Sequence, residues 1–196
     1  IEGNSSELAN DLLHGTIDLM IDLLPFTAEN VDTVPICQEE ILLVVPDEVL
    51  KKAHPDGWDE LRKKMEQGAD VRLLENCPFV LLNKGNRVRT IADEIFEDAQ
   101  VTPHIALETE NIETALALSV KGMGITFYPR MFMSPDHAAN TNKNPLTHQT
   151  GLNLYPLNYS RAHGTLGLGY HKGHYMSRAT HEFIRIALER IPYKND

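Results

Sequence analysis

The fold is decided by residues 77–129, CPFVLLNKGNRVRTIADEIFEDAQVTPHIALETENIETALALSVKGMGITFYP. Short apolar runs and longer amphipathic runs alternate along this stretch, which predicts strands at 79–82, 104–107 and 124–127 and helices at 87–99 and 112–121. Strands and helices that alternate with short connections are typical of a parallel sheet covered by helices. The sequence therefore predicts an α/β fold.

The flanking sequence predicts further elements of both kinds. Helices are expected at 4–14, 56–67 and 177–191, and strands at 16–21, 33–37, 40–45, 151–158 and 164–171. The helix at 56–67 is polar and has the character of a surface insertion, with Trp58, Leu61 and Met65 on one face. Residues 135–151 are rich in Asn, Thr, Pro and His and are expected to form an exposed loop.

Charge and hydropathy exclude some classes of partner. The 196 residues include 28 acidic and 18 basic side chains, which gives a formal net charge of −10. This charge repels a polyanion, so we do not expect this chain to bind nucleic acid directly. No apolar run approaches the roughly 20 residues that a membrane-spanning helix needs, and we expect no membrane partner.

Cys37 and Cys77 are isolated, with no CxxC motif or Cys/His cluster around them. We expect reduced, structural thiols rather than a disulfide, which favours a cytoplasmic location. The first residues, IEGNSSEL, contain neither a basic leader nor an apolar signal core, but a processed chain would also lack them. Export therefore stays open at this point.

Loops follow three of the expected strands. They are Asn83–Asn86, Thr109–Asn111 and Pro25–Phe26. In a parallel α/β sheet such loops meet at the carboxyl ends of the strands, where unpaired helix amides and the positive end of the helix dipole can hold an anion. The pattern indicates a binding site for a small acid.

The loop NKGNRVR at 83–89 has the most informative composition. Gly85 allows close backbone approach, Asn86 can donate to a ligand, and the basic residues around it add positive charge. The alternative is a capped helix with solvated basic residues, since the loop lacks the ending of a phosphate-binding loop. Asn111 has the same ambiguity because it is a good helix N-cap.

The order of these motifs resembles the effector-binding domain of LysR-type transcription regulators. The resemblance rests on EGNSSELANDLLHGTIDLMI, with Gly15, Ile17 and Asp18 in a G-x-[IL]-D pattern, and on EEILLVVP, CPFVLLNKGNRVRTIADEIF, ETENIETALALSVKGMGITFYP and YMSRATHEFIRIAL. It extends over most of the chain, and the combination is more specific than any one motif.

The resemblance implies a two-lobed, periplasmic-binding-protein-like (type 2) α/β fold with two crossover strands and the effector between the lobes. Lobe one would comprise residues 1–74 and 162–196, and lobe two residues 75–161. The ligand-binding residues that the resemblance implies are Phe26, Asn83, Gly85, Asn86, Arg87, Thr109, Glu110 and Asn111. These lie on the same loops that the residues themselves indicate.

The sequence departs from the family pattern in three ways. The family has a strand and a helix before the EG segment, with a hydroxyl-bearing effector contact, and neither is present in these 196 residues. The family often has Ser or Thr at the position of Asn86, so effector specificity cannot be transferred. The helix at 56–67 lengthens a connection that is usually shorter, and we have no functional explanation for it.

Other chemistries are poorly supported. His163, His171, His174 and His181 are close in sequence, but a turn separates His171 from His174 and no acidic or thiol ligand lies among them, so we expect no metal site. No hydrolase motif and no acid pair in an apolar setting is present, so we expect no enzyme activity and no cofactor. A redox-sensing thiol pair is disfavoured because the two cysteines would lie in or beside different lobes.

The sequence thus predicts an effector-sensing domain that binds a small anionic metabolite and changes the angle between its lobes. The alternative is a solute-binding protein or an enzyme on the same two-lobe fold. The resemblance also implies pairing of sensing domains into homo-oligomers. DNA contact would be made through a separate winged helix-turn-helix domain that is not part of this sequence.

Overall fold

The computed structural model describes residues 1, 3–26, 28–132 and 152–191. Contacts between residues divide the chain into two compact units. The first unit comprises 1–39, 85–87 and 163–196, and the second comprises 40–84 and 88–162. The loop expected at 135–151 lies outside the described residues.

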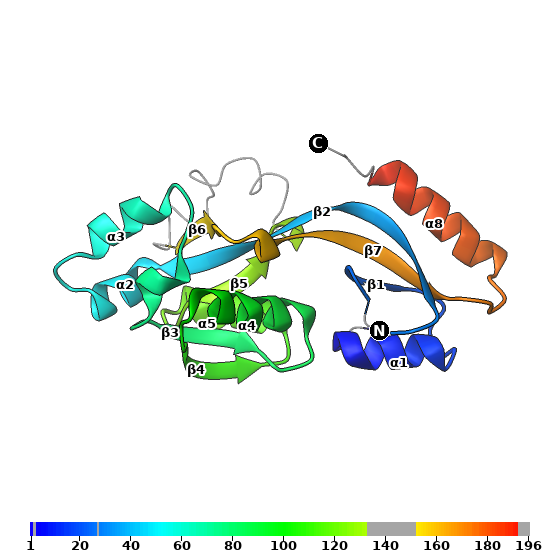
Figure 1. Ribbon diagram of the computed structural model, residues 1–196, viewed down its shortest axis with the longest axis horizontal. Coiled ribbons are helices and arrows are strands. Elements are labelled where there is room, and N and C mark those ends of the chain that lie inside the picture. Colours follow the sequence, from blue (N-terminus) through cyan, green and yellow to red (C-terminus); the bar gives the residue numbers. More distant parts are fainter. Residues whose placement is uncertain (2, 27, 133–151, 192–196) are drawn as a thin grey trace. The chain divides into compact units, whose positions relative to one another are not determined.

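The first unit contains α1 (Ser5–Leu13), β1 (Met20–Leu23), the start of β2 (Val31–Pro46), β7 (His163–His171) and α8 (Arg178–Arg190) (Figure 1). β1 pairs antiparallel with β7, and β7 is also the neighbour of β2. The helix expected at 4–14 is present, but the strand expected at 16–21 begins only at Met20. The amides of Thr16 and Ile17 both donate to the Asp11 carbonyl, which uses these residues to close the end of α1.

The core of the first unit lies under α1. Ala9, Leu12 and Met20 form a buried cluster, against which Phe26 packs as a partly buried side chain. A Cβ atom on Gly169 of β7 would lie 2.4 Å from the Phe26 ring, so only glycine permits this contact. α8, in contrast, exposes Phe183 and most of its other apolar residues in the described chain.

The second unit contains the rest of β2 and a larger α/β assembly. Its elements are α2 (Asp47–Ala53), α3 (Trp58–Met65), β3 (Pro78–Leu82), α4 (Arg87–Ala99), β4 (His104–Thr109), α5 (Ile112–Val120), β5 (Thr126–Pro129) and β6 (Leu152–Pro156). Short 3-10 helices lie at Val71–Leu74, Arg130–Phe132 and Ser160–Ala162. The alternation of strands and helices predicted for residues 77–129 is confirmed.

Two parallel strands, the buried β3 and the largely exposed β4, contribute to this unit. β3 pairs in parallel with β4, and it meets the strand segment before β5 through two hydrogen bonds of 2.8 Å, from Val80 to Ile125 and from Ile125 to Pro78. A Cβ atom on Gly124 would lie 2.8 Å from the Pro78 carbonyl oxygen, so glycine lets these strands approach. β2 pairs antiparallel with both β5 and β6.

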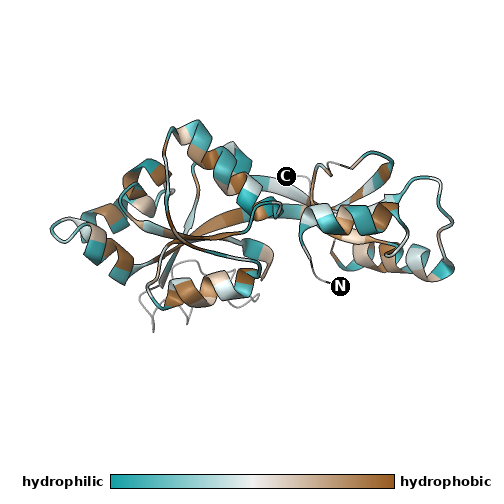
Figure 2. Cartoon of the chain, turned by 90° about the horizontal axis from the view of Figure 1, so that it is seen from below, coloured by the Kyte–Doolittle hydropathy of each residue, from teal (hydrophilic) through white to brown (hydrophobic). Residues whose placement is uncertain are grey.

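The core of the second unit is built on β2, β3 and α4. Residues 42–45 of β2 are fully buried, and the rings of Phe79, Phe96 and Phe127 pack with centroids 5.1 to 6.3 Å apart. Figure 2 shows hydrophobic residues concentrated on these strands, with polar residues on the outer sides of the helices. This is the distribution that burial of apolar surface favours.

β2 differs from the sequence-based expectation. The sequence predicted two strands at 33–37 and 40–45, whereas β2 is continuous over 16 residues. The polar residues between the predicted strands do not interrupt it, because β2 has β7 as a neighbour in the sheet. Residues 41–46, which pair with β5 and β6, lie in the second unit. The lobe boundaries that the resemblance implies, with residues 1–74 and 162–196 in lobe one, stay a prediction.

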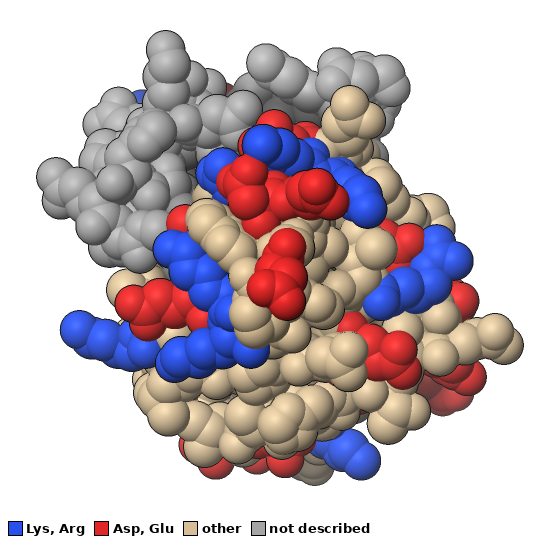
Figure 3. Space-filling model, turned by 90° about the vertical axis from the view of Figure 1, so that its left-hand side faces the viewer, with Lys and Arg blue, Asp and Glu red and all other residues tan. Residues whose placement is uncertain are grey.

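The polar helix expected at 56–67 is present as α3. Trp58 lies under Lys51, whose Nζ is 4.4 Å from the ring centroid, while Leu61 and Met65 are buried. Ion pairs from Asp59 to Arg62 and Lys63 run along its outer side. Acidic and basic side chains are interspersed on the face in Figure 3, and the charges there form no continuous basic patch. No helix among the described residues could span a bilayer.

Candidate functional site

Two of the predicted loops meet at the carboxyl ends of β3 and β4. Leu82, the last residue of β3, pairs with Thr109, the last residue of β4. The amide of Asn83 donates to the Thr109 carbonyl at 2.9 Å, so the ladder continues one step beyond the strand. The structure therefore brings Asn83 and Thr109 together at one edge of the second unit.

Asn111 lies at the same edge and caps α5. Its Oδ1 accepts hydrogen bonds from the amides of Glu113 and Thr114 at 2.9 and 3.1 Å. The Asn111 amide in turn donates to Thr109 Oγ1 at 3.4 Å, a weak bond. The capping role is thus observed, and it leaves the Asn111 NH2 group as the part of the side chain that can donate to a ligand. The neighbouring Glu110 is exposed.

A buried arginine ties the ends of these two strands together. Arg89 on α4 is 4% exposed, and its Nη1 donates to the Leu82 carbonyl at 2.7 Å and to the carboxylate of Glu108. Its Nε donates to Asp93 at 2.8 Å. The basic residues of the loop at 83–89 were expected to offer positive charge to a ligand, and for Arg89 this prediction is wrong because its guanidinium is bonded to protein groups. Arg89 instead positions the residues that immediately precede Asn83 and Thr109.

The start of α5 is fixed to β5 by a second contact. The Tyr128 hydroxyl donates to Glu113 Oε1 at 2.5 Å. Burial and this carboxylate raise the pKa of Tyr128, so the phenol stays protonated as a donor. The start of α5 is therefore fixed by the cap at Asn111 and by the bond between Glu113 and Tyr128 of β5.

The other part of the predicted site belongs to the first unit. Gly85 has φ +93°, and a Cβ atom there would lie 2.5 Å from the Asn4 side chain. The amide of Arg87 donates to Ser5 Oγ at 3.2 Å. The glycine is therefore needed both for its backbone conformation and for the close approach of Asn4. Asn86 is partly buried and has interactions of its own.

Asp22 is a member of this group that the sequence did not single out. Burial raises the pKa of its carboxyl group, while a hydrogen bond from Ser5, the Leu23 amide and the charge of Arg87 act in the opposite direction. The sequence feature that could have identified Asp22 is an acidic residue at the end of an apolar strand. Asn4 caps α1, and Ser5 is the first residue of that helix.

Phe26 was expected to contact the effector. In the structure its ring packs against the buried cluster under α1 and against Gly169. A structural role therefore accounts for part of its surface, and its role toward a ligand stays a prediction.

Among the described residues, the histidines and cysteines form no metal-ligating cluster and no disulfide. The His171 and His174 rings stack with centroids 3.6 Å apart, and the described residues contain no group of three or more His, Cys, Asp or Glu side chains placed to hold a metal ion. Cys37 and Cys77 are free thiols. Burial raises the pKa of Cys77 to about 11, which disfavours the reactive thiolate.

Solved structures define the class of fold. The chain superposes on the effector-binding domain of QuiR in complex with shikimate with a TM-score of 0.71 and 19% identity, covering 97% of this chain and 78% of that one. It superposes on the Synechocystis PCC6803 CcmR regulatory domain in complex with 2-PG with a TM-score of 0.74 and 15% identity, covering 96% and 80%. The periplasmic-binding-protein-like fold predicted from the sequence is confirmed.

The family is shown by the sequence comparisons. The model of the LysR substrate binding domain matches residues 1–192, so the chain belongs to this family, as predicted. The HTH-type transcriptional regulator YcgK of Bacillus subtilis strain 168 is 27% identical over 137 residues, which cover 67% of this chain and 42% of that protein. The regulator YybE of the same organism is 29% identical over 129 residues, covering 65% and 40%. The chain is thus a LysR substrate binding domain. It spans about two fifths of the length of these two curated relatives.

Proposed function

We propose that this domain senses a small anionic metabolite through the polar loops at the ends of its strands. The observation that carries the proposal is the convergence of Asn83, Thr109 and Asn111 at the carboxyl ends of two adjacent parallel strands. α5 begins at this edge, so its dipole adds positive potential there. Hydrogen-bond donors at strand ends suit reversible binding of an anion.

The site residues Gly85, Asn86, Arg87, Glu110 and Phe26 remain part of the proposal. Arg87 would supply the positive charge toward an anion, with Asp22 limiting how much of that charge is available. Two similar domains were solved with shikimate and with 2-PG, which supports a small-molecule effector here. Membership of the regulator family disfavours the solute-binding protein and the enzyme.

The role in the whole protein is also a proposal. Effector binding would favour one arrangement of the domain, and this difference in affinity would be transmitted to a DNA-binding domain elsewhere in a homo-oligomeric, cytoplasmic regulator. The likeness to the curated HTH-type regulators supports this assignment.

The experiment is a thermal-shift screen of carboxylate metabolites, followed by calorimetric titration of any compound that stabilises the domain. Asn111→Asp keeps an oxygen that can cap α5 but replaces the NH2 donor with a negative charge, so it should abolish stabilisation by an anionic effector. Ser177→Ala, which removes the N-cap of α8 in the first unit, controls for a loss of stability that leaves the proposed site intact. An effector that binds Asn111→Asp as tightly as the wild-type domain would contradict the proposed site.

A further inference from the structure

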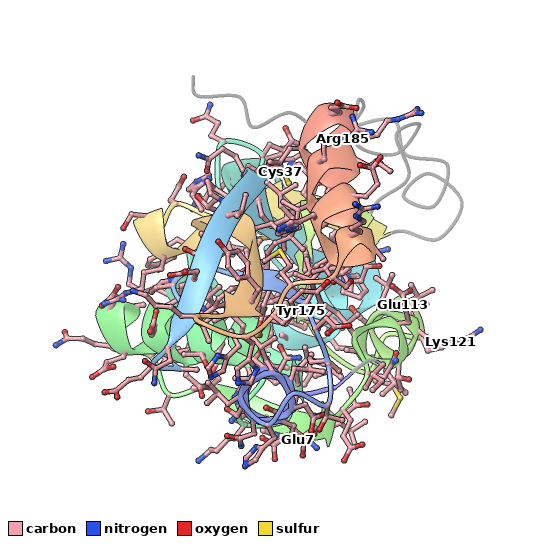
Figure 4. The ribbon with its side chains drawn as sticks, turned by 90° about the vertical axis from the view of Figure 1, so that its right-hand side faces the viewer. Glu7, Cys37, Glu113, Lys121, Tyr175 and Arg185 are labelled. Atoms are coloured by element: carbon pink, nitrogen blue, oxygen red, sulfur yellow. The ribbon has the colours of Figure 1, made fainter. Side chains whose placement is uncertain are left out.

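A pocket lies wholly within the first unit, away from the strand-end loops described above. Its volume is about 190 Å³, and it lies among the end of α1, the turn before β1, the end of β7 and the start of α8. Side chains that line it include Asp18, Tyr170, His171, His174, Tyr175 and Thr180. Figure 4 labels Tyr175 in the segment that joins β7 to α8, the helix that carries Arg185.

The polar groups of this pocket are mainly acceptors. Asp18 is an exposed carboxylate with no hydrogen-bond or ion-pair partner in the described part of the chain. Nδ1 of His171 is buried and has no hydrogen-bond partner, although an unsatisfied buried nitrogen is costly. The His171 ring is held in place by stacking on His174. A ligand that donates hydrogen bonds would satisfy both acceptors.

The charges around the pocket favour a cation over an anion. Asp18 is the only lining residue with a full charge when the histidines are neutral, and neither lysine nor arginine lines the pocket. At the start of α8, the amide of Thr180 already donates to Ser177 Oγ at 3.1 Å and is not available to an anion. Tyr170 and Tyr175 offer aromatic faces that attract cations, and the net charge of −10 concentrates cations near the protein.

The size of the pocket distinguishes an organic cation from a metal ion. A volume of about 190 Å³ is several times the roughly 30 Å³ that one water molecule occupies in the liquid. The described residues also contain no group of three or more side chains placed to hold a metal ion. A short carbon chain with an ammonium group matches both the volume and the acceptors.

We propose that this pocket binds a small primary ammonium compound. Its N–H groups donate to the Asp18 carboxylate and to Nδ1 of His171, with the imidazole proton on Nε2. Its carbon chain lies against the tyrosine and histidine rings. The site is independent of the proposed effector site, and its preference for charge is the opposite one.

The test is calorimetric titration of the domain with propylammonium chloride, with sodium propionate as a probe of equal chain length and opposite charge. We expect saturable binding of propylammonium at concentrations of about 10 mM or below, and none of propionate. Asp18→Asn should weaken the binding at least tenfold. Glu29→Gln, which removes an exposed acidic side chain from the same unit, should leave it unchanged.

His171→Phe provides a second variant, because phenylalanine retains a ring for stacking but removes the acceptor. It should also weaken propylammonium binding while the melting temperature shows that the domain is folded. The proposal is overturned if propylammonium shows no saturable binding, if propionate binds equally well, or if both variants bind as the wild-type domain does.

Discussion

Arg89→Met should destabilise the domain markedly, because the guanidinium of Arg89 connects three parts of the second unit. The substitution preserves much of the buried volume but removes the donor to the Leu82 carbonyl and both ion pairs. Leaving a buried acceptor without its partner costs about 1–3 kcal/mol. Breaking a fully buried ion pair costs about 3–5 kcal/mol.

The cost of breaking the ion pairs is smaller than this range for Arg89. The carboxylates of Asp93 and Glu108 are each 46% exposed and can be hydrated again once Arg89 is gone. We therefore expect a total loss of about 2–3 kcal/mol in the free energy of unfolding. Because Leu82 and Glu108 directly precede Asn83 and Thr109, the variant should also weaken effector binding.

Urea denaturation followed by circular dichroism measures this loss as a lower transition midpoint. Arg185→Met is the matched control, since Arg185 pairs with Glu182 and Glu189 on the exposed surface of α8 and its removal should leave the midpoint nearly unchanged. A loss for Arg89→Met no larger than that of the control would refute the reasoning that Arg89 holds the strand ends.

Three further predictions concern single side chains. Asn111→Ala should cost about 1 kcal/mol in the free energy of unfolding through loss of the α5 cap, and thermal melts should show Asn111→Asp to be closer to the wild-type domain. The raised pKa of Asp22 means that ionisation of this carboxyl group opposes folding. The stability of the wild-type domain relative to Asp22→Asn should therefore fall as the pH rises from 3.8 through the higher pKa of the folded state. Urea melts across this pH range measure the difference in stability, and a constant difference would exclude the effect. Cys77, with its pKa raised to about 11, should react with a thiol reagent more slowly than the half-buried Cys37 at pH 8, and equal rates by mass spectrometry would contradict its burial.

The order of elements could be predicted because local patterns determine it. The run from Cys77 to Pro129 alternates between two periodicities, and its strands and helices appear in the predicted order, although the strand expected at 124–127 begins two residues later, as β5 at Thr126. The exact length of β2 could not be predicted in the same way. Its polar middle interrupts the apolar pattern, and only the neighbouring strand β7, distant in sequence, makes it continuous.

The candidate site was predictable in its loops but not in its electrostatics. Turn and cap residues at strand ends identified Asn83 and Asn111, because those residue types have local backbone preferences. Arg89 looked like a solvated cation in the sequence, and its burial depends on carboxylates that only the fold brings near it. Asp22 and Ser5 likewise acquire their contact with the loop at Arg87 only in three dimensions.

The most direct test of effector sensing is nuclear magnetic resonance of the domain labelled with ¹⁵N, recorded while an anionic effector from the thermal-shift screen is added. The side-chain NH2 resonances of Asn83 and Asn111 report directly on these two hydrogen-bond donors. We expect saturable shifts for the NH2 groups of Asn83 and Asn111 and for the backbone amide of Thr109, all with the same midpoint. Saturable binding that leaves these three signals unchanged would contradict the central claim.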